Sequence, residues 1–241
     1  MEELDLIFGP NSNLNEIYRR EPGRVLVAHL EFIFQRMGIP EDQIKLLSTK
    51  IANYCRKLYM MHLAGEKTLH WEQEFISTQN REMPVLIWED EIEMLYHLEA
   101  MILFGRSALD IGAYVFTRLL LPPIGQKRID SFNDFSKNIL KSNDEYSELK
   151  VALQALENNE ESWYRLLCGI TKGRSLRDKI AHQTVIHIDY RETRPNSEKE
   201  YCHVILGKYQ GVPLEKFITD LSSGVMNFCL LSEDVIVKKY S

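Results

Sequence analysis

The sequence predicts a mainly α-helical protein, a helical bundle with one small antiparallel β-hairpin. Apolar residues recur every three or four positions through most of the 241-residue chain, which is the spacing of amphipathic helices. Prolines and glycines fall where these periodic segments begin and end, as expected of helix boundaries. Late in the chain the spacing changes to alternation in two short segments, which predicts strands.

The predicted helices follow one another along the chain between these breakers. Their expected ranges are 24–37, 40–65, 84–121, 130–140, 145–158 and 162–170, with a last helix from about Pro213. Gly38 and Gly65 are expected to end the first two helices, and Gly105 or Gly112 is expected to kink the third. The helices before residue 83 would form an N-terminal extension to the bundle.

Two alternating segments, TVIHIDYR at 184–191 and EYCHVILG at 200–207, flank a turn-rich loop. We expect an antiparallel hairpin whose apolar side chains share one face. The expected register pairs Ile186 with Val204, Ile188 with Cys202 and His187 with His203. His187, His203 and Asp189 would lie on the other face, where they are an alternative metal site, although a polar strand face more often points to solvent.

The composition is that of a soluble globular protein. Apolar residues make up 44% and charged residues 27%, and the formal net charge is -6 at pH 7. Because the net charge is negative, a nucleic-acid contact requires a local basic patch. The first residues lack a signal-peptide pattern, and charged residues interrupt the longest apolar passage. We therefore expect a cytoplasmic protein without a membrane span.

The domain organisation is predicted as an N-terminal helical segment at 1–82 and a helical domain at 83–241 that contains the hairpin at 184–207.

The four cysteines are widely scattered and form no Cys-x-x-Cys pair. We therefore expect reduced thiols, no zinc site and no other metal.

The stretch KGRSLRDKIAHQ, 172–183, is the strongest candidate for a functional site. Ser175, followed three residues later by Asp178, has the form of a helix capping box. A helix that starts there presents unpaired backbone N–H groups and a positive dipole end, which favour a phosphate. The cations that would bind substrate phosphates beside this helix start are Lys172, Arg174 and Lys179, with Arg177 as a fourth.

Asp178 and His182 are four residues apart, so they share a helix face and can hydrogen-bond. A carboxylate beside a histidine raises its pKa and fixes the orientation of its ring. Arg177 lies five positions before His182 and is therefore turned away by about 140° around the helix. Either the arginine curls round, or a second subunit completes the site, which favours a homodimer.

The segment RDKIAH, 177–182, resembles the arginine–polar–x3–histidine motif of the HEPN superfamily. GRSALDIGAYVF, 105–116, is similar to an early helix of several such families, and its Arg106 and Asp110 are an i, i+4 pair. The resemblance covers about residues 84–236. It departs from the family pattern in the 80 or so residues that precede it and in the hairpin directly after the histidine.

The resemblance implies a dimeric helical bundle that acts as a metal-independent endoribonuclease, in a prokaryotic toxin or phage-defence system. Arg177 and His182 would be the catalytic pair and Asp178 would orient them, with Arg106 and Asp110 as contributors from the second helix. No cofactor is implied, because the RNA 2′-hydroxyl is itself the nucleophile. RNA or a nucleotide would be the ligand, and a neutralising protein could be a further partner.

Other interpretations of the same residues stay open. The basic stretch can be an ordinary capped helix with a solvated face, and Arg106 and Asp110 can be a simple intrahelical salt bridge, which is the favoured interpretation of that pair. The chain can also be a non-catalytic helical module that binds a nucleotide, nucleic acid or a protein partner. The spacing alone is weak, because Arg24 and His29 match it as well.

Overall fold

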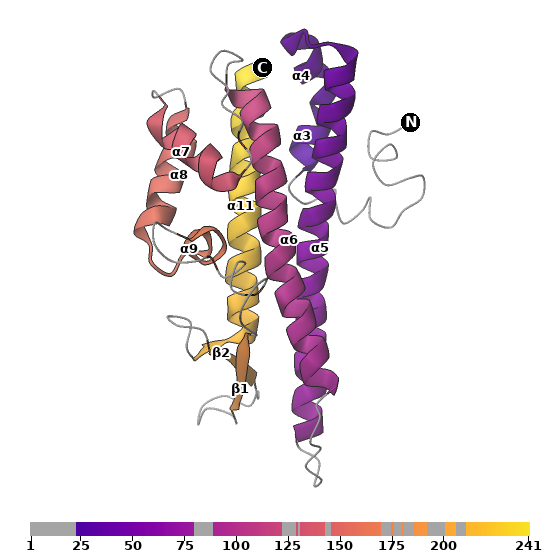
Figure 1. Ribbon diagram of the computed structural model, residues 1–241, viewed down its shortest axis with the longest axis vertical. Helices are drawn as coiled ribbons and strands as arrows, with labels where there is room; N and C mark the ends of the chain where they lie inside the picture. Colours follow the sequence, from indigo (N-terminus) through magenta and orange to yellow (C-terminus); the bar gives the residue numbers. More distant parts are fainter. Residues whose placement is uncertain are drawn as a thin grey trace. The chain divides into compact units, whose positions relative to one another are not determined.

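The computed structural model describes residues 23–79, 89–121, 129, 131–142, 146–169, 175, 180, 186–191, 201–205 and 211–241. Within these ranges the chain forms eight helices and a three-stranded antiparallel sheet, so the predicted helical bundle with a small hairpin is confirmed (Figure 1). The helices are α3 (Arg24–Ala28), α4 (Leu30–Met37), α5 (Glu41–Gln79), α6 (Glu89–Leu120), α7 (Phe132–Lys141), α8 (Ser147–Asn158), α9 (Trp163–Cys168) and α11 (Leu214–Tyr240). The strands are β1 (His187–Arg191), β2 (Tyr201–Ile205) and β3 (Val212–Pro213).

The chain divides into two compact units that are discontinuous in sequence. Unit 1 comprises Met1–Leu58, Arg106–Asn159 and Val225–Ser241, and unit 2 comprises Tyr59–Gly105 and Glu160–Gly224. The predicted boundary near residue 82 does not coincide with this division. The three long helices α5, α6 and α11 each contribute residues to both units.

Helices α5 and α6 pack as an antiparallel pair with a heptad-spaced core. Buried positions recur at alternating intervals of three and four residues along each helix, which is the pattern of coiled-coil packing. On α5 they are Leu47, Ile51, Tyr54, Leu58, Met61, Gly65, Thr68, Glu72 and Phe75, and on α6 Met94, Leu98, Met101, Gly105, Ala108, Gly112, Val115 and Leu119.

Glycines at this seam let the two helices approach closely. A Cβ atom at Gly65 would lie 3.3 Å from Met101 Sδ, one at Gly105 would lie 2.9 Å from Met61 Sδ, and one at Gly112 would lie 3.1 Å from Tyr54. In each pair the residue numbers add up to 166, as a constant antiparallel register requires. Each large side chain therefore fills the space that the opposite glycine leaves.

The expectation that Gly65 ends a helix was wrong, and the kink expected at Gly105 or Gly112 stays a prediction. Helix α5 does not end at Gly65 but continues to Gln79, and α6 continues through Gly105 and Gly112 as one helix of 32 residues. Glycine inside a helix costs about 1 kcal/mol relative to alanine. Here that cost is offset by packing, since Gly65 also lies against Ile218 of α11.

The first predicted helix is divided into α3 and α4 at His29. This residue adopts φ -113° and ψ 4°, outside the helical region, and its Nδ1 lies 2.8 Å from the Val25 carbonyl oxygen. Gly38 ends α4 as predicted, because it takes the left-handed conformation (φ 60°) that favours glycine and its N–H donates to the Phe34 carbonyl.

Unit 1 has an aromatic core between α6, α7 and α11. Phe116, Phe132, Phe135 and Phe228 are buried, and neighbouring rings have centroids 5.3–5.9 Å apart in edge or tilted arrangements. Helix α7 begins after Ser131, whose hydroxyl accepts from the Asp134 N–H. The side chains of successive turns of α7 thereby enter this core.

The last turn of α6 is closed by donors from other helices of unit 1. Tyr240 donates to the Leu119 carbonyl at 2.7 Å, and both Tyr146 and Lys239 donate to the Leu120 carbonyl. The final carbonyl groups of a helix have no partner within it. Residues far along the chain therefore supply the C-terminal cap of α6.

Unit 2 contains the sheet, whose strand order is β1-β2-β3. The observed register differs from the expected one by two residues. It pairs His187 with Ile205, Ile188 with Val204, Asp189 with His203, Tyr190 with Cys202 and Arg191 with Tyr201. Because side chains alternate with a period of two, a shift of two residues keeps every side chain on its expected face while changing its partner.

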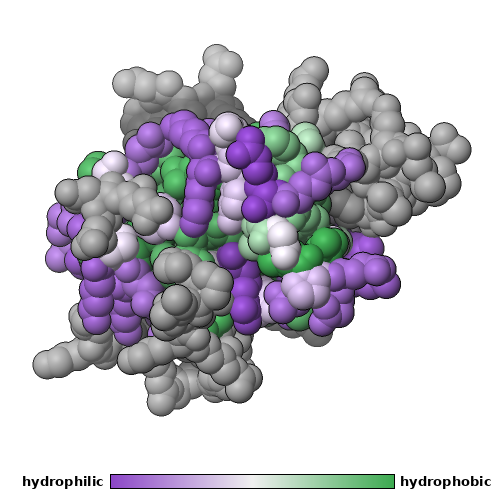
Figure 2. Space-filling view, turned by 90° about the horizontal axis from the view of Figure 1, so that it is seen from above, coloured by the Kyte–Doolittle hydropathy of each residue, from purple (hydrophilic) through white to green (hydrophobic). Residues whose placement is uncertain are grey.

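Helix α6 has the length and hydropathy of a membrane span, but 61% of its apolar window is buried inside the protein. This burial is typical of the core helix of a soluble protein. In the space-filling view polar residues cover much of the coloured face, with apolar residues visible between them (Figure 2).

Candidate functional site

The predicted catalytic residues Arg177, Asp178 and His182 lie outside the described residues. The same holds for the predicted phosphate-binding cations Lys172, Arg174 and Lys179. Of this stretch the structure describes Ser175, which is 5% exposed, and Ile180. The predicted cap residue is therefore packed within the protein, and the catalytic pair stays a prediction.

The predicted contributors from the long helix, Arg106 and Asp110, form a close ion pair on α6. Arg106 Nε donates to Asp110 Oδ2 and the Arg106 Nη2 atom lies close to Asp110 Oδ1, both at 3.0 Å. The side chains are 11% and 30% exposed, so the two-point contact is largely shielded from water. Such a two-point contact fixes the orientation of both groups.

This ion pair also holds the beginning of α7. Asp110 Oδ1 accepts from the backbone N–H of Phe132, the first residue of α7, at 2.8 Å, and Arg106 Nη1 donates to Asn133 Oδ1 at 3.3 Å. The contact therefore joins two helices rather than one. It supports a structural role for the pair, in line with the salt-bridge interpretation of the sequence.

A buried carboxyl group on α11 of unit 1, not identified from the sequence, accepts three hydrogen bonds. Glu233 is 0% exposed. Its Oε1 accepts from the Gly23 N–H at 2.6 Å and from the Tyr54 hydroxyl at 2.9 Å, and its Oε2 accepts from the Leu26 N–H at 3.3 Å. Burial raises the pKa of Glu233 to about 7, although these three donors act in the opposite direction.

The hydroxyl and thiol groups around Glu233 are neutral near pH 7. Burial raises the pKa of the Tyr54 hydroxyl and of the Cys55 and Cys229 thiols well above their usual values. None of the described Lys, Arg or His residues forms an ion pair with Glu233. Among the side chains that the structure describes, the carboxyl group is thus held by hydrogen bonds alone.

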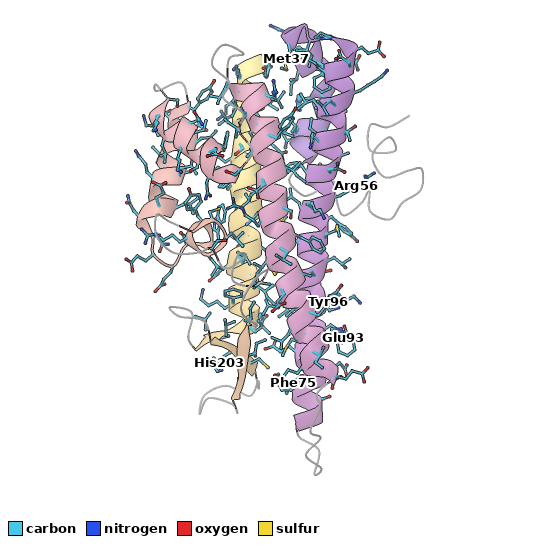
Figure 3. All side chains as sticks on the ribbon, in the orientation of Figure 1. Met37, Arg56, Phe75, Glu93, Tyr96 and His203 are labelled. Carbon is cyan, nitrogen blue, oxygen red and sulfur yellow. The ribbon has the colours of Figure 1, made fainter. Side chains whose placement is uncertain are left out.

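A second buried acid, Glu72, supports the sheet of unit 2. Its Oε1 accepts from the backbone N–H of Cys202 on β2 at 2.8 Å, and Glu72 is 6% exposed. The next residue of β2, His203, is 1% exposed, so its imidazole does not face solvent as a polar strand face usually does (Figure 3). Asp189, its partner on β1, has a side chain outside the described set.

Both glutamates could have been found from the sequence. Glu72 occupies a heptad core position of α5, and Glu233 follows Ser232 at a buried turn of α11. An acidic residue where the helical period calls for an apolar one is costly to bury unless it is hydrogen-bonded. Such interruptions of the apolar period are the signal in the sequence that marks both positions.

An open pocket of about 370 Å³ lies between the start of α8 and the end of α11 in unit 1. Two of its lining residues are the cations Lys238 and Lys239. Lys238 Nζ lies 3.0 Å from Glu148 Oε1, and Lys239 Nζ donates to the Leu120 carbonyl. The protein itself therefore engages both ammonium groups.

Metal ligands are not gathered in the part of the chain that the structure describes. No group of three or more His, Cys, Asp or Glu side chains there could hold an ion. All four cysteines are buried and none is in a disulfide.

No protein-family model matches the chain, and neither a curated protein nor a solved structure matches it.

Proposed function

We propose that this protein is a metal-independent endoribonuclease of the HEPN type, active in the cytoplasm as a homodimer. The observation that carries the proposal is the segment RDKIAH, 177–182, late in a chain that forms a helical bundle. Its setting adds support, because a local excess of positive charge surrounds it in a chain of net charge -6. A prokaryotic toxin or phage-defence role is the setting that the resemblance suggests.

His182 is the proposed general acid or base, a role worth roughly 10²–10⁴-fold in rate. It would take the proton from the RNA 2′-hydroxyl or give one to the leaving 5′-oxygen. Arg177 would stabilise the negative charge that develops on the phosphate. Asp178 would orient the imidazole, and Lys172, Arg174 and Lys179 would hold neighbouring phosphates.

The contacts of Arg106 and Asp110 reduce the number of proposed catalytic groups. Both side chains are engaged with each other and with the first two residues of α7. We therefore assign them to positioning α7, and leave the chemistry to the residues of 172–182.

The test is cleavage of a mixed-sequence, single-stranded RNA in the presence of EDTA. Wild-type protein should cut the RNA, while His182→Ala and Arg177→Ala should each lose at least 100-fold in rate. The chain provides its own control in His29→Ala. His29 stands at the same spacing from Arg24 but lies exposed at the α3–α4 break, so this variant should cut as fast as wild type.

A DNA strand of the same sequence should not be cut, because it lacks the 2′-hydroxyl. Equal cleavage by wild type and His182→Ala would refute the proposed role of the histidine. Binding of RNA without cleavage by the wild type would favour the non-catalytic module instead.

A further inference from the structure

We propose that Glu233 is a proton-operated clasp for α3, holding this helix against α5 and α11 and loosening it as the carboxyl group ionises. The proposal concerns unit 1 and does not depend on the proposed ribonuclease activity. It starts from the observation that one side chain of α11 satisfies the backbone of a helix more than 200 positions earlier in the sequence.

Helix α3 has no cap of its own. Its N-cap residue is Gly23, which has no side chain to accept from the first turn. An N-cap side chain normally accepts from the N–H of the second or third helical residue. Glu233 takes over this role from α11, because its two oxygens accept from Gly23 and from Leu26, the third residue of α3.

The helix depends on this contact because it is short. Five residues are too few for a stable isolated helix in water. Its remaining attachment is apolar, since Leu26 and Val27 are 0% and 3% exposed. Gly23 also lies so close to Cys55 that a Cβ there would be 2.4 Å from the thiol sulfur. Loss of the clasp would therefore open a narrow, defined part of unit 1.

Burial of Glu233 between α3, α5 and α11 favours its neutral form and outweighs the hydrogen bonds from α3 and α5, which favour the ionised form. Among the groups that the structure describes on α3, the backbone N–H groups of Gly23 and Leu26 face the carboxyl group. Helix α5 presents Tyr54 and Cys55, and α11 presents Cys229, all neutral below pH 9 because burial raises their pKa values. Burial is the largest cause of the raised pKa of Glu233, and the like charge of Asp234 on α11 raises this pKa further.

The sign of the effect follows from the two states of the clasp. While α3 is docked, burial raises the pKa of Glu233 from 4.5 to about 7, and opening exposes the carboxyl group to water. The docked state therefore binds a proton more tightly than the open state. Docking is strongest below about pH 4.5 and weakens as the pH rises to about 7. Full recovery of the ordinary pKa would raise the opening constant by roughly 300-fold.

The experiment is hydrogen exchange of the full chain, followed by mass spectrometry for the amides of α3 at pH 5 and pH 8. Protection factors are corrected for the intrinsic pH dependence of exchange. In the wild type, α3 should lose at least tenfold in protection at pH 8, while amides of α7 in the same unit should not change. In Glu233→Gln the pH dependence of α3 should disappear.

Asp234→Asn is the matched control, because it removes the neighbouring carboxyl group, which is exposed. This variant should keep the pH dependence of α3. The proposal is overturned if wild-type protection of α3 is the same at both pH values, or if Glu233→Gln retains the full dependence.

A second measurement remains decisive if Glu233→Gln does not fold. Titration of the Glu233 carboxyl carbon by NMR in the wild type should give a midpoint near pH 7. In Tyr54→Phe, which removes one donor to the carboxyl group, the midpoint should move to higher pH. A wild-type midpoint below pH 5 would refute the clasp.

Discussion

Among the described glycines, Gly224 of α11 in unit 2 has the closest side-chain neighbour. A Cβ atom at this position would lie 2.1 Å from Cδ1, 2.7 Å from Nε1 and 2.9 Å from Cγ of Trp163. Trp163 is only 8% exposed, so its indole ring has little room to withdraw. Gly224→Ala therefore tests whether this glycine is required by the ring or is merely tolerated in the helix.

Two effects of opposite sign decide the magnitude. Alanine is favoured over glycine inside a helix by about 1 kcal/mol. Atoms in contact are about 3.5 Å apart, so the indole would have to move by more than 1 Å. Overpacking of this kind costs typically about 1–3 kcal/mol. Because the clash involves a rigid ring rather than the end of a flexible chain, we expect the upper end and a net loss of about 2 kcal/mol.

The assay is urea unfolding of four proteins: wild type, Gly224→Ala, Trp163→Ala and the double variant. With the ring removed, Gly224→Ala should become stabilising by about 1 kcal/mol, so the sign of its effect reverses. Ser223→Ala, at the exposed neighbouring position, should change the free energy of unfolding by less than about 0.5 kcal/mol. The reasoning is refuted if Gly224→Ala stabilises the protein equally with and without Trp163.

Three further predictions concern unit 1. Asp110→Ala should lower the free energy of unfolding, measured by urea denaturation, by roughly 3 kcal/mol, because it leaves a largely buried Arg106 without its carboxylate. Asp110→Asn should cost less, since its amide oxygen can still accept from the Phe132 N–H. An equal cost of the two variants would contradict this explanation. Tyr240→Phe should cost about 1 kcal/mol through loss of the hydrogen bond to Leu119, with faster amide exchange in the last turn of α6 as a second readout. The free energy of unfolding of the wild type, relative to that of Glu233→Gln, should fall by up to about 3 kcal/mol between pH 4.5 and pH 7. The reason is that the folded protein holds the Glu233 proton more tightly than the unfolded chain does. A rise of this relative stability with pH would be inconsistent with the raised pKa.

Helical periodicity was sufficient to predict the class of fold and most of its elements. It works because most buried positions at every third or fourth residue are apolar, whatever the neighbouring helix is. The errors came from residues that have two uses. Gly65 was interpreted as a helix end, but a glycine also serves where two helices approach closely, and only the position of Met101 distinguishes these uses.

The hairpin shows a second limit of sequence reasoning. Alternation determines which side chains share a face, and that prediction is confirmed by the register, which places Ile188 opposite Val204 and Asp189 opposite His203. It does not determine the partner across the strands, because registers that differ by two residues satisfy the same alternation. Here the observed register pairs Ile188 with Val204 instead of Cys202.

For the site, the sequence identified the ion pair of Arg106 and Asp110 from its spacing of four residues. It did not reveal their link to Phe132, because a contact between distant segments leaves no local pattern. The helical period marks Glu233 as an unusual acid, but it does not identify the donors Gly23 and Tyr54, which are 210 and 179 positions away.

The cap on the last turn of α6 bears on how the protein is made. Tyr240 and Lys239 bind carbonyl groups of residues synthesised about 120 positions earlier. Until Tyr240 has left the ribosome, the carbonyl groups at the end of α6 lack these two donors. Unit 1 can therefore complete its folding only after α11 has emerged, and the intermediates that precede this step expose surface to which a chaperone can bind.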